Sequence, residues 1–99
     1  MARVLVVDDS ADTVAMLAFH LKEQGHQVSA AYGGEEALRL VATEPPDLVL
    51  LDVNMPGMNG LEVCGRLKAE PRWESIPVQF RGHTLNSYAP SVSGRVFEA

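Results

Sequence analysis

Short apolar runs that alternate with segments of helical periodicity constrain the fold of this chain more than any other feature of its sequence. The runs lie at Arg3–Val7, Val28–Ala31, Leu48–Leu51 and Ile76–Phe80. The first and third are apolar at almost every position, which is typical of strands buried on both faces of a parallel sheet. Segments with apolar side chains at helical spacing separate the runs, and Ser10 is placed to cap the first of them. Strands and helices in this alternation form βαβ units, so the sequence predicts an open α/β fold with a parallel sheet.

The length and composition are those of a small globular domain. The chain has 99 residues, of which 46% are hydrophobic and 21% are charged, and no apolar run approaches the roughly 20 residues that a membrane helix needs. A formal net charge of -5 argues against a nucleic-acid surface. The single cysteine, Cys64, cannot form an internal disulfide, and the acidic start does not resemble a signal peptide. We therefore expect a soluble, cytoplasmic, single-domain protein that binds neither nucleic acid nor membranes.

Carboxylates directly follow two of the predicted strands. Asp8 and Asp9 come after the first apolar run, and Asp52 comes after the third. Because functional groups gather beyond the carboxyl ends of parallel strands, these side chains should meet at one rim of the sheet if the two strands are neighbours. A set of oxygen ligands favours a hard cation such as Mg2+, and a carboxylate can itself act as a nucleophile toward phosphorus. The spacing leaves a second possibility open, an acidic and solvated strand end without an ion.

The stretch VLVVDDSAD, followed by DLVLLDVNMPGMNG and then by IPV, resembles the receiver domain of bacterial two-component response regulators. The resemblance implies a doubly wound, flavodoxin-like parallel sheet. It also implies that Asp52 is the phosphoacceptor, that Asp8 and Asp9 hold Mg2+ together with Asp52, and that Asn54 lends its backbone carbonyl to the metal. The expected partner is a histidine kinase or a phosphotransfer protein. These expectations describe a signalling module and not an enzyme.

The resemblance covers Met1 to about Val78, and the pattern changes after that point. We therefore expect a receiver-like α/β core at residues 1–78 and a divergent tail of the same domain at residues 79–99. A truncated or frame-shifted reading frame and a natural, divergent ending both explain such a change.

Two functional positions of the family lack a counterpart beyond Val78. Gly82 stands where the family has a Thr or Ser, and no lysine occurs after Lys68. The fifth strand, which ends in Lys-Pro in the family, and the fifth helix are therefore expected to be missing. Arg81 carries a positive charge nearby, but its planar guanidinium group differs from an ammonium group, so we do not expect it to replace the lysine.

A missing fifth strand would leave the fourth strand at an edge of the sheet. Its open N–H and C=O groups would invite pairing with another chain. The tail also contains apolar side chains, among them Phe80, Leu85 and Phe97. We therefore expect that any homodimer forms through the fourth-strand edge or through the tail.

The function expected first is that of a receiver module in a two-component phosphorelay. The alternative is a phosphorylation-silent receiver remnant that acts in binding or oligomerisation, and the missing lysine favours it. A Mg2+-dependent phosphohydrolase is a weaker candidate, because such enzymes carry two acidic residues two positions apart on the first strand, whereas this chain has Asp8-Asp9-Ser10. A dinucleotide site is weaker still, because no Gly-x-Gly turn follows the first strand.

Overall fold

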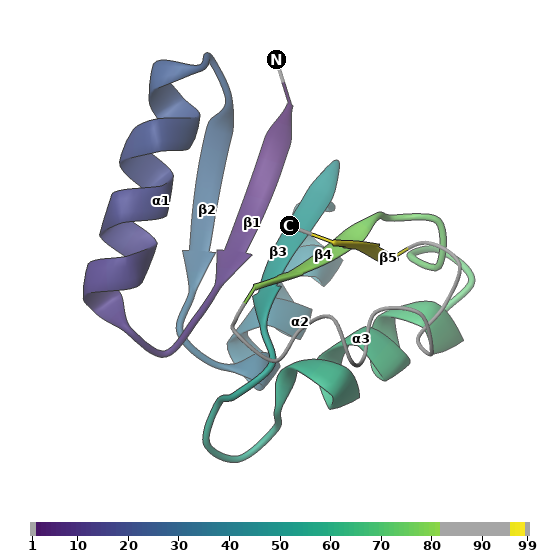
Figure 1. Cartoon of the computed structure of the whole chain (residues 1–99). Coiled ribbons are helices and arrows are strands. Elements are labelled where there is room, and N and C mark those ends of the chain that lie inside the picture. Colours follow the sequence, from purple (N-terminus) through teal and green to yellow (C-terminus); the bar gives the residue numbers. More distant parts are fainter. Residues whose placement is uncertain (1, 82–95, 99) are drawn as a thin grey trace.

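Strands and helices alternate along the chain, as the sequence predicts. The structure is a computed structural model that describes residues 2–81 and 96–98. The strands are β1 (Arg3–Val7), β2 (Gln27–Ala31), β3 (Leu48–Asp52), β4 (Val78–Arg81) and β5 (Val96–Glu98). The helices are α1 (Ala11–Glu23), α2 (Gly34–Thr43) and α3 (Gly60–Ala69). Each strand from β1 to β3 leads through a short loop into a helix (Figure 1).

All strands of the sheet are parallel and lie in the order β2-β1-β3-β4-β5. The chain order reverses between β1 and β3, which pair with Val7 opposite Leu51. In open α/β sheets, functional groups gather beyond the carboxyl ends of the strands at such a reversal. The doubly wound, receiver-like fold expected from the sequence is therefore confirmed, and its switch point lies between β1 and β3.

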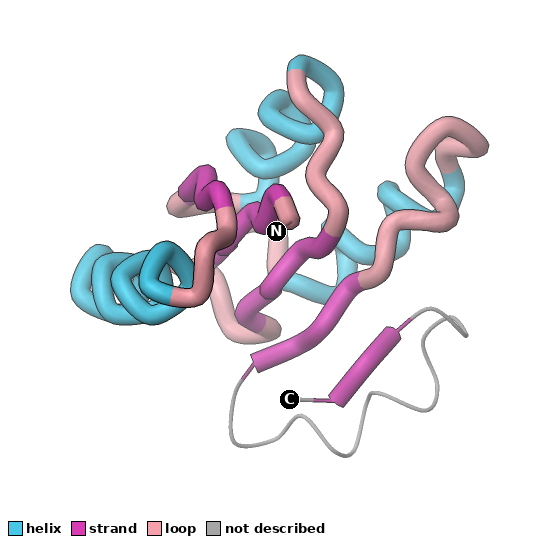
Figure 2. The backbone as a smooth tube through the Cα atoms, turned by 90° about the horizontal axis from the view of Figure 1, so that it is seen from above, coloured by secondary structure: helices cyan, strands magenta, loops and turns pink. Residues whose placement is uncertain are grey.

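Helices cover both faces of the sheet. Figure 2 shows α1 on one side of the strands and α2 with α3 on the other. Alternate residues of β1 divide between the faces: Leu5 and Val7 belong to the larger core under α2 and α3, whereas Val4 and Val6 pack with Val14 of α1. Burial on both faces explains why the first and third apolar runs of the sequence do not alternate with polar residues.

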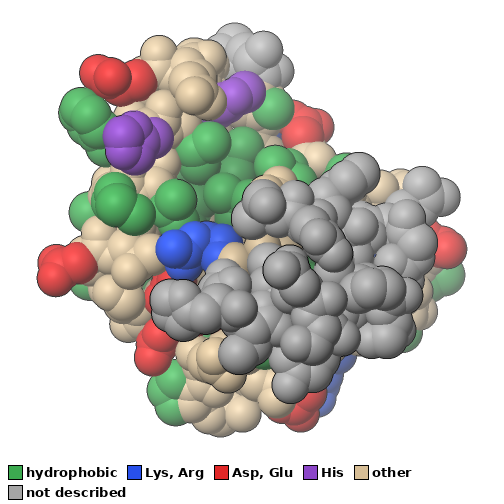
Figure 3. All heavy atoms as spheres, in the orientation of Figure 1, with side chains coloured by type: hydrophobic (Ala, Val, Ile, Leu, Met, Phe, Trp, Pro, Cys, Tyr) green, Lys and Arg blue, Asp and Glu red, His purple; other side chains and the backbone are tan. Residues whose placement is uncertain are grey.

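The core beneath α1 is the smaller of the two. Partly buried side chains surround its buried members, and they are Ala2, Leu17, Leu21, Val28, Ala30 and Leu48. Hydrophobic side chains also gather at the surface on this face (Figure 3), and Met16 and Phe19 of α1 are exposed. Among the described residues, no helix has both the length and the apolar character needed to cross a membrane.

Side chains cap two of the helices. The hydroxyl of Ser10 accepts a hydrogen bond from the backbone N–H of Thr13 at 3.3 Å, which confirms the cap predicted from the sequence. Asn59 caps α3 in a reciprocal pair, in which Asn59 accepts from the Glu62 N–H at 3.0 Å and Glu62 accepts from the Asn59 N–H at 3.1 Å. Such capping boxes satisfy two backbone donors that a helix start otherwise leaves without partners.

The sheet differs from the expectation at its last strand. The sequence predicts no fifth strand and an open edge at β4, but β5 pairs with β4, placing Val96 opposite Val78 and Glu98 opposite Phe80. The physical reason is that the open N–H and C=O groups of β4 can pair with an extended segment, and β5 supplies one. The β4 edge is therefore covered over the paired residues, and the predicted homodimer contact stays a prediction. The rest of the tail, residues 82–95 and 99, lies outside the described residues.

Candidate functional site

The three carboxylates singled out in the sequence meet at one rim of the sheet. Oxygen atoms of Asp8, Asp9 and Asp52 all lie within 4.8 Å of one another. Asp8 and Asp9 follow the last residue of β1, and Asp52 is the last residue of β3. The direct pairing of β1 with β3 places these positions side by side. The fold therefore confirms the predicted convergence of the carboxylates at the switch point.

Asp8 is the most buried of the three carboxylates, with 4% of the residue exposed. Its Oδ1 atom accepts a hydrogen bond from the backbone N–H of Ser10 at 2.9 Å. Its Oδ2 atom accepts one from Nη1 of Arg81, also at 2.9 Å. Burying a charged carboxylate costs free energy unless a cation or hydrogen-bond donors stabilise it. Asp8 has both a cationic partner and a backbone donor.

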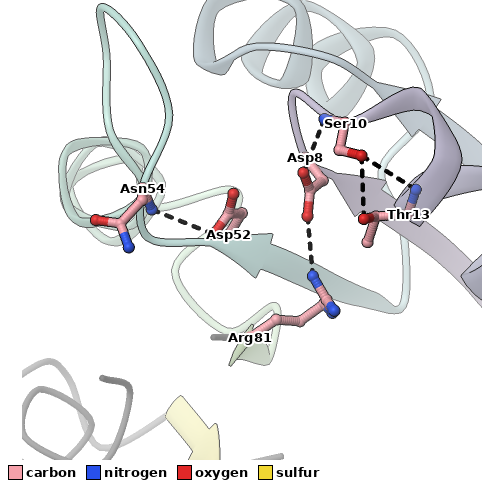
Figure 4. A network of polar contacts seen from close by, with 6 residues as sticks. All are labelled: Asp8, Ser10, Thr13, Asp52, Asn54 and Arg81. Carbon is pink, nitrogen blue, oxygen red and sulfur yellow. Dashed lines mark hydrogen bonds and ion pairs between the residues drawn. The ribbon is translucent and has the colours of Figure 1, made fainter. Parts of the chain in front are cut away.

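Asp52 is only partly buried, and Asp9 is exposed. The backbone N–H of Asn54 donates to Oδ1 of Asp52 at 3.2 Å (Figure 4). Burial raises the pKa of Asp52 above its ordinary value, and the charges of Asp8 and Asp9 raise it further. The hydrogen bond from Asn54 and the charge of Arg81 lower the pKa, but they do not cancel the increase. Asp52 is thus an acid in a crowded negative environment that a cation would relieve.

Arg81 lines the site, although the sequence analysis does not include it among the site residues. The expectation that it does not replace the family's lysine stays a prediction, but its guanidinium group reaches into the site and pairs with Asp8 (Figure 4). A usable signal exists in the sequence. Arg81 directly follows the last apolar residue of the fourth strand, Phe80, just as Asp52 follows Leu51. The two residues are register partners across β3 and β4, so the rule that places the carboxylates at the rim also places Arg81 there.

The charged groups surround a hollow of about 390 Å³. Its lining consists of Asp8, Asp9, Ser10, Thr13, Asp52, Asn54 and Arg81. The hollow therefore contains every site residue that the sequence predicts, and adds Ser10, Thr13 and Arg81. The role of the Asn54 backbone carbonyl stays a prediction, since the structure assigns a hydrogen bond only to its N–H in this site.

The donor set fits a hard divalent cation. Asp8, Asp9 and Asp52 supply carboxylate oxygens, and the hollow contains no sulfur or imidazole ligand among the described residues. Oxygen ligands of this kind suit Mg2+, which keeps several waters and needs only one or two carboxylates from the protein. The residues present are therefore able to bind such an ion.

Gly60, the first residue of α3, lies directly against the end of β3. A Cβ atom at this position would collide with the backbone carbonyl oxygen of Asp52 and would approach Cα of Val53 to 2.9 Å. The N–H of Gly60 donates to the carbonyl oxygen of Val53 at 3.0 Å. The helix start thus holds the backbone that carries Asp52, and only glycine allows this close approach.

Comparison with known proteins agrees with the fold. Residues 4–88 match the family model described as the response regulator receiver domain, a match that extends beyond Val78. Response regulator PleD of Caulobacter vibrioides is 47% identical over 77 residues, which are 78% of this chain and 17% of PleD. The chain thus corresponds to a small part of that relative's length.

Solved structures of similar fold cover nearly the whole chain. The N-terminal domain of a response regulator receiver protein from Methanoculleus marisnigri aligns with a TM-score of 0.84 and 32% identity, over 99% of this chain and 84% of that one. Response regulator protein TrrA of Thermotoga maritima, solved in complex with Mg(2+)-BeF, aligns with a TM-score of 0.82 and 33% identity, over 99% and 84% of the two chains. Because the family match spans most of the sequence, the chain belongs to the response regulator receiver domain family of two-component systems.

Proposed function

We propose that this chain accepts a phosphoryl group on Asp52 in a Mg2+-dependent reaction, as a receiver module of a two-component phosphorelay. The observation that carries the proposal is the convergence of three carboxylates within 4.8 Å at the switch point of a receiver fold. Asp52 is the member of this cluster that ends a strand, is partly exposed and has a backbone donor on one oxygen.

The chemistry assigned to Asp52 is nucleophilic. A carboxylate oxygen of Asp52 forms a bond to phosphorus while the bond from phosphorus to the donor atom breaks, and the donor leaves with the electron pair of that bond. With a phosphohistidine donor the leaving group is the imidazole nitrogen, and with acetyl phosphate it is acetate. The Asn54 N–H holds the Asp52 carboxylate in place, which limits the reorientation needed for attack.

Asp8, Asp9 and Asp52, together with the backbone carbonyl of Asn54, are the groups that would hold Mg2+. When bound, the ion would neutralise part of the charge of the carboxylates and of the incoming phosphoryl group. Asp8 would be the fixed member of this set, because it is buried and accepts a hydrogen bond from the Ser10 N–H. Asp9 is exposed, so its side chain would be free to reorient toward the ion.

The partner that follows from this proposal is a histidine kinase or a phosphotransfer protein, in the cytoplasm. The chain itself acts as a signalling module and not as an enzyme with turnover. Phosphorylation of Asp52 would act on the output through the protein surfaces that the domain contacts.

The test is the intact mass of the protein after incubation with acetyl phosphate, with and without Mg2+. We expect a gain of one phosphoryl group that requires Mg2+ and is lost in Asp52→Asn. Asp12→Asn is the matched control, because Asp12 is an exposed acid in the first turn of α1 and does not line the hollow. A gain that persists in Asp52→Asn, or no gain under any condition, would refute the proposal.

A second candidate function is a phosphorylation-silent binding module. The observation that favours it is the Arg81 pair, which offsets the charge of Asp8. Absence of the phosphoryl gain in a protein that still binds Mg2+ would select this function.

A further inference from the structure

The buried carboxylate of Asp8 has two candidate cationic partners, Mg2+ and Arg81. Asp8 is assigned to Mg2+ in the proposed function, on which this inference rests, yet its Oδ2 atom already accepts from Arg81 at 2.9 Å. A metal ion and a guanidinium group both bind carboxylate oxygens through their positive charge. Arg81 and Mg2+ would therefore compete for Asp8.

We propose that Arg81 is an exchangeable counter-ion that pairs with Asp8 in the resting site and binds the phosphoryl group once Asp8 is engaged by Mg2+. It would thereby bring a positive charge from β4 to the end of β3.

Three features of the structure place Arg81 for this exchange. It is the register partner of Asp52 on the neighbouring strand, and strands in a sheet lie only about 4.8 Å apart. Its side chain is 28% exposed, so it is not locked in a closed core. Of the described residues that line the hollow, it is the only cationic one.

The chemistry of the guanidinium group suits both partners. It is always charged, and its fork of N–H donors matches the oxygens of a carboxylate as well as those of a phosphoryl group. Moving from Asp8 to phosphorylated Asp52 would exchange one charge-assisted contact for another. The movement of Arg81 would therefore leave neither Asp8, then bound to Mg2+, nor the phosphoryl group without a cationic partner.

A fixed structural ion pair is the alternative explanation. In that case Arg81 would join β4 to the end of β1 and would play no part in binding a phosphoryl group. The two explanations differ in the sign of their effects, because a competitor for Asp8 weakens metal binding whereas a structural support strengthens it.

The experiment measures two affinities in parallel. Mg2+ binding is followed by titration calorimetry, and capture of beryllofluoride, a phosphoryl mimic, is followed by fluorine NMR in saturating Mg2+. The variants are Arg81→Gln, which removes the charge, and Arg81→Lys, which keeps it. Arg39→Gln is the matched control, since Arg39 is an exposed arginine on α2. Thermal unfolding of each variant verifies that it is folded.

For Arg81→Gln we expect Mg2+ to bind more tightly, by a few-fold, and beryllofluoride to bind about tenfold or more weakly, as for a lost charge-assisted hydrogen bond. Arg81→Lys should retain most of the beryllofluoride affinity, and Arg39→Gln should change neither affinity. Weakening of both ligands by Arg81→Gln, or no change in either, would overturn the inference while leaving the proposed function standing. Failure of the wild-type protein to bind either ligand would overturn the proposed function itself, and the inference with it.

Discussion

Gly60→Ala provides a sharp test of how the fold holds the phosphoacceptor. The new Cβ would meet the Asp52 carbonyl oxygen and would lie 2.9 Å from Cα of Val53. Both neighbours are backbone atoms at the end of β3, so neither can turn away as a flexible side chain would. The end of the strand or the start of α3 must therefore shift. Gly65→Ala in the same helix is the matched control, because Gly65 is exposed and a Cβ there meets nothing within 4 Å.

The magnitudes follow from two opposing terms. Overpacking of this kind costs about 1–3 kcal/mol, whereas replacing glycine by alanine in a helix stabilises it by up to about 1 kcal/mol. Gly60→Ala should thus lower the free energy of unfolding by about 1–2 kcal/mol, and Gly65→Ala should raise it by about 0.5–1 kcal/mol. In a domain of this size each kcal/mol shifts Tm by roughly 4–8 °C.

Urea unfolding followed by the fluorescence of Trp73, which packs against the larger core, measures both free energies. Phosphorylation by acetyl phosphate measures the effect on the site. We expect about a tenfold or greater loss of rate in Gly60→Ala, since small displacements of reacting groups have large effects on rate, and no loss in Gly65→Ala. A Gly60→Ala protein as stable and as reactive as the wild type would refute the close approach on which this reasoning depends.

Three further predictions concern the cap, the core and the site. Asn59→Ala removes the capping box of α3 and should cost about 1 kcal/mol in urea unfolding; an unchanged midpoint would contradict the role of the cap. Leu67→Ala leaves a cavity where a side chain that is 1% exposed fills the larger core, and it should lower the free energy of unfolding by about 2–5 kcal/mol. A loss well below about 1 kcal/mol would show that the surrounding core closes the cavity. Asp52→Asn tests the raised pKa of Asp52 in Mg2+-free buffer. Because the pKa is higher in the folded state, the folded protein takes up its proton first, so the Asp52 contribution to wild-type stability grows as pH falls through the folded-state pKa. The variant should therefore be more stable than the wild type near neutral pH, with a difference that shrinks in acid, and a difference that widens in acid would contradict the sign of the shift.

Local sequence patterns determined the order of the elements and the location of the carboxylates. The alternation of apolar runs with helical periodicity predicts the parallel sheet, because a strand buried on both faces must be apolar at successive positions. Asp8 and Asp52 follow such runs directly, and parallel strands end at a common rim. The cap at Ser10 is equally local, since its partner Thr13 lies three residues away. These features depend on neighbours in the chain, so sequence suffices to predict them.

Contacts between distant segments decided the rest. Arg81 and Asp8 are separated by 73 positions, and only the packing of β4 beside β3 brings the guanidinium group to the rim. The pairing of β5 with β4 likewise depends on where the chain returns in space. Adjacent Asp8 and Asp9 look equivalent in the sequence, but the fold buries the first and exposes the second. Burial and charge pairing are properties of the assembled structure, and they determine which carboxylate is held in place and which side chain supplies the positive charge.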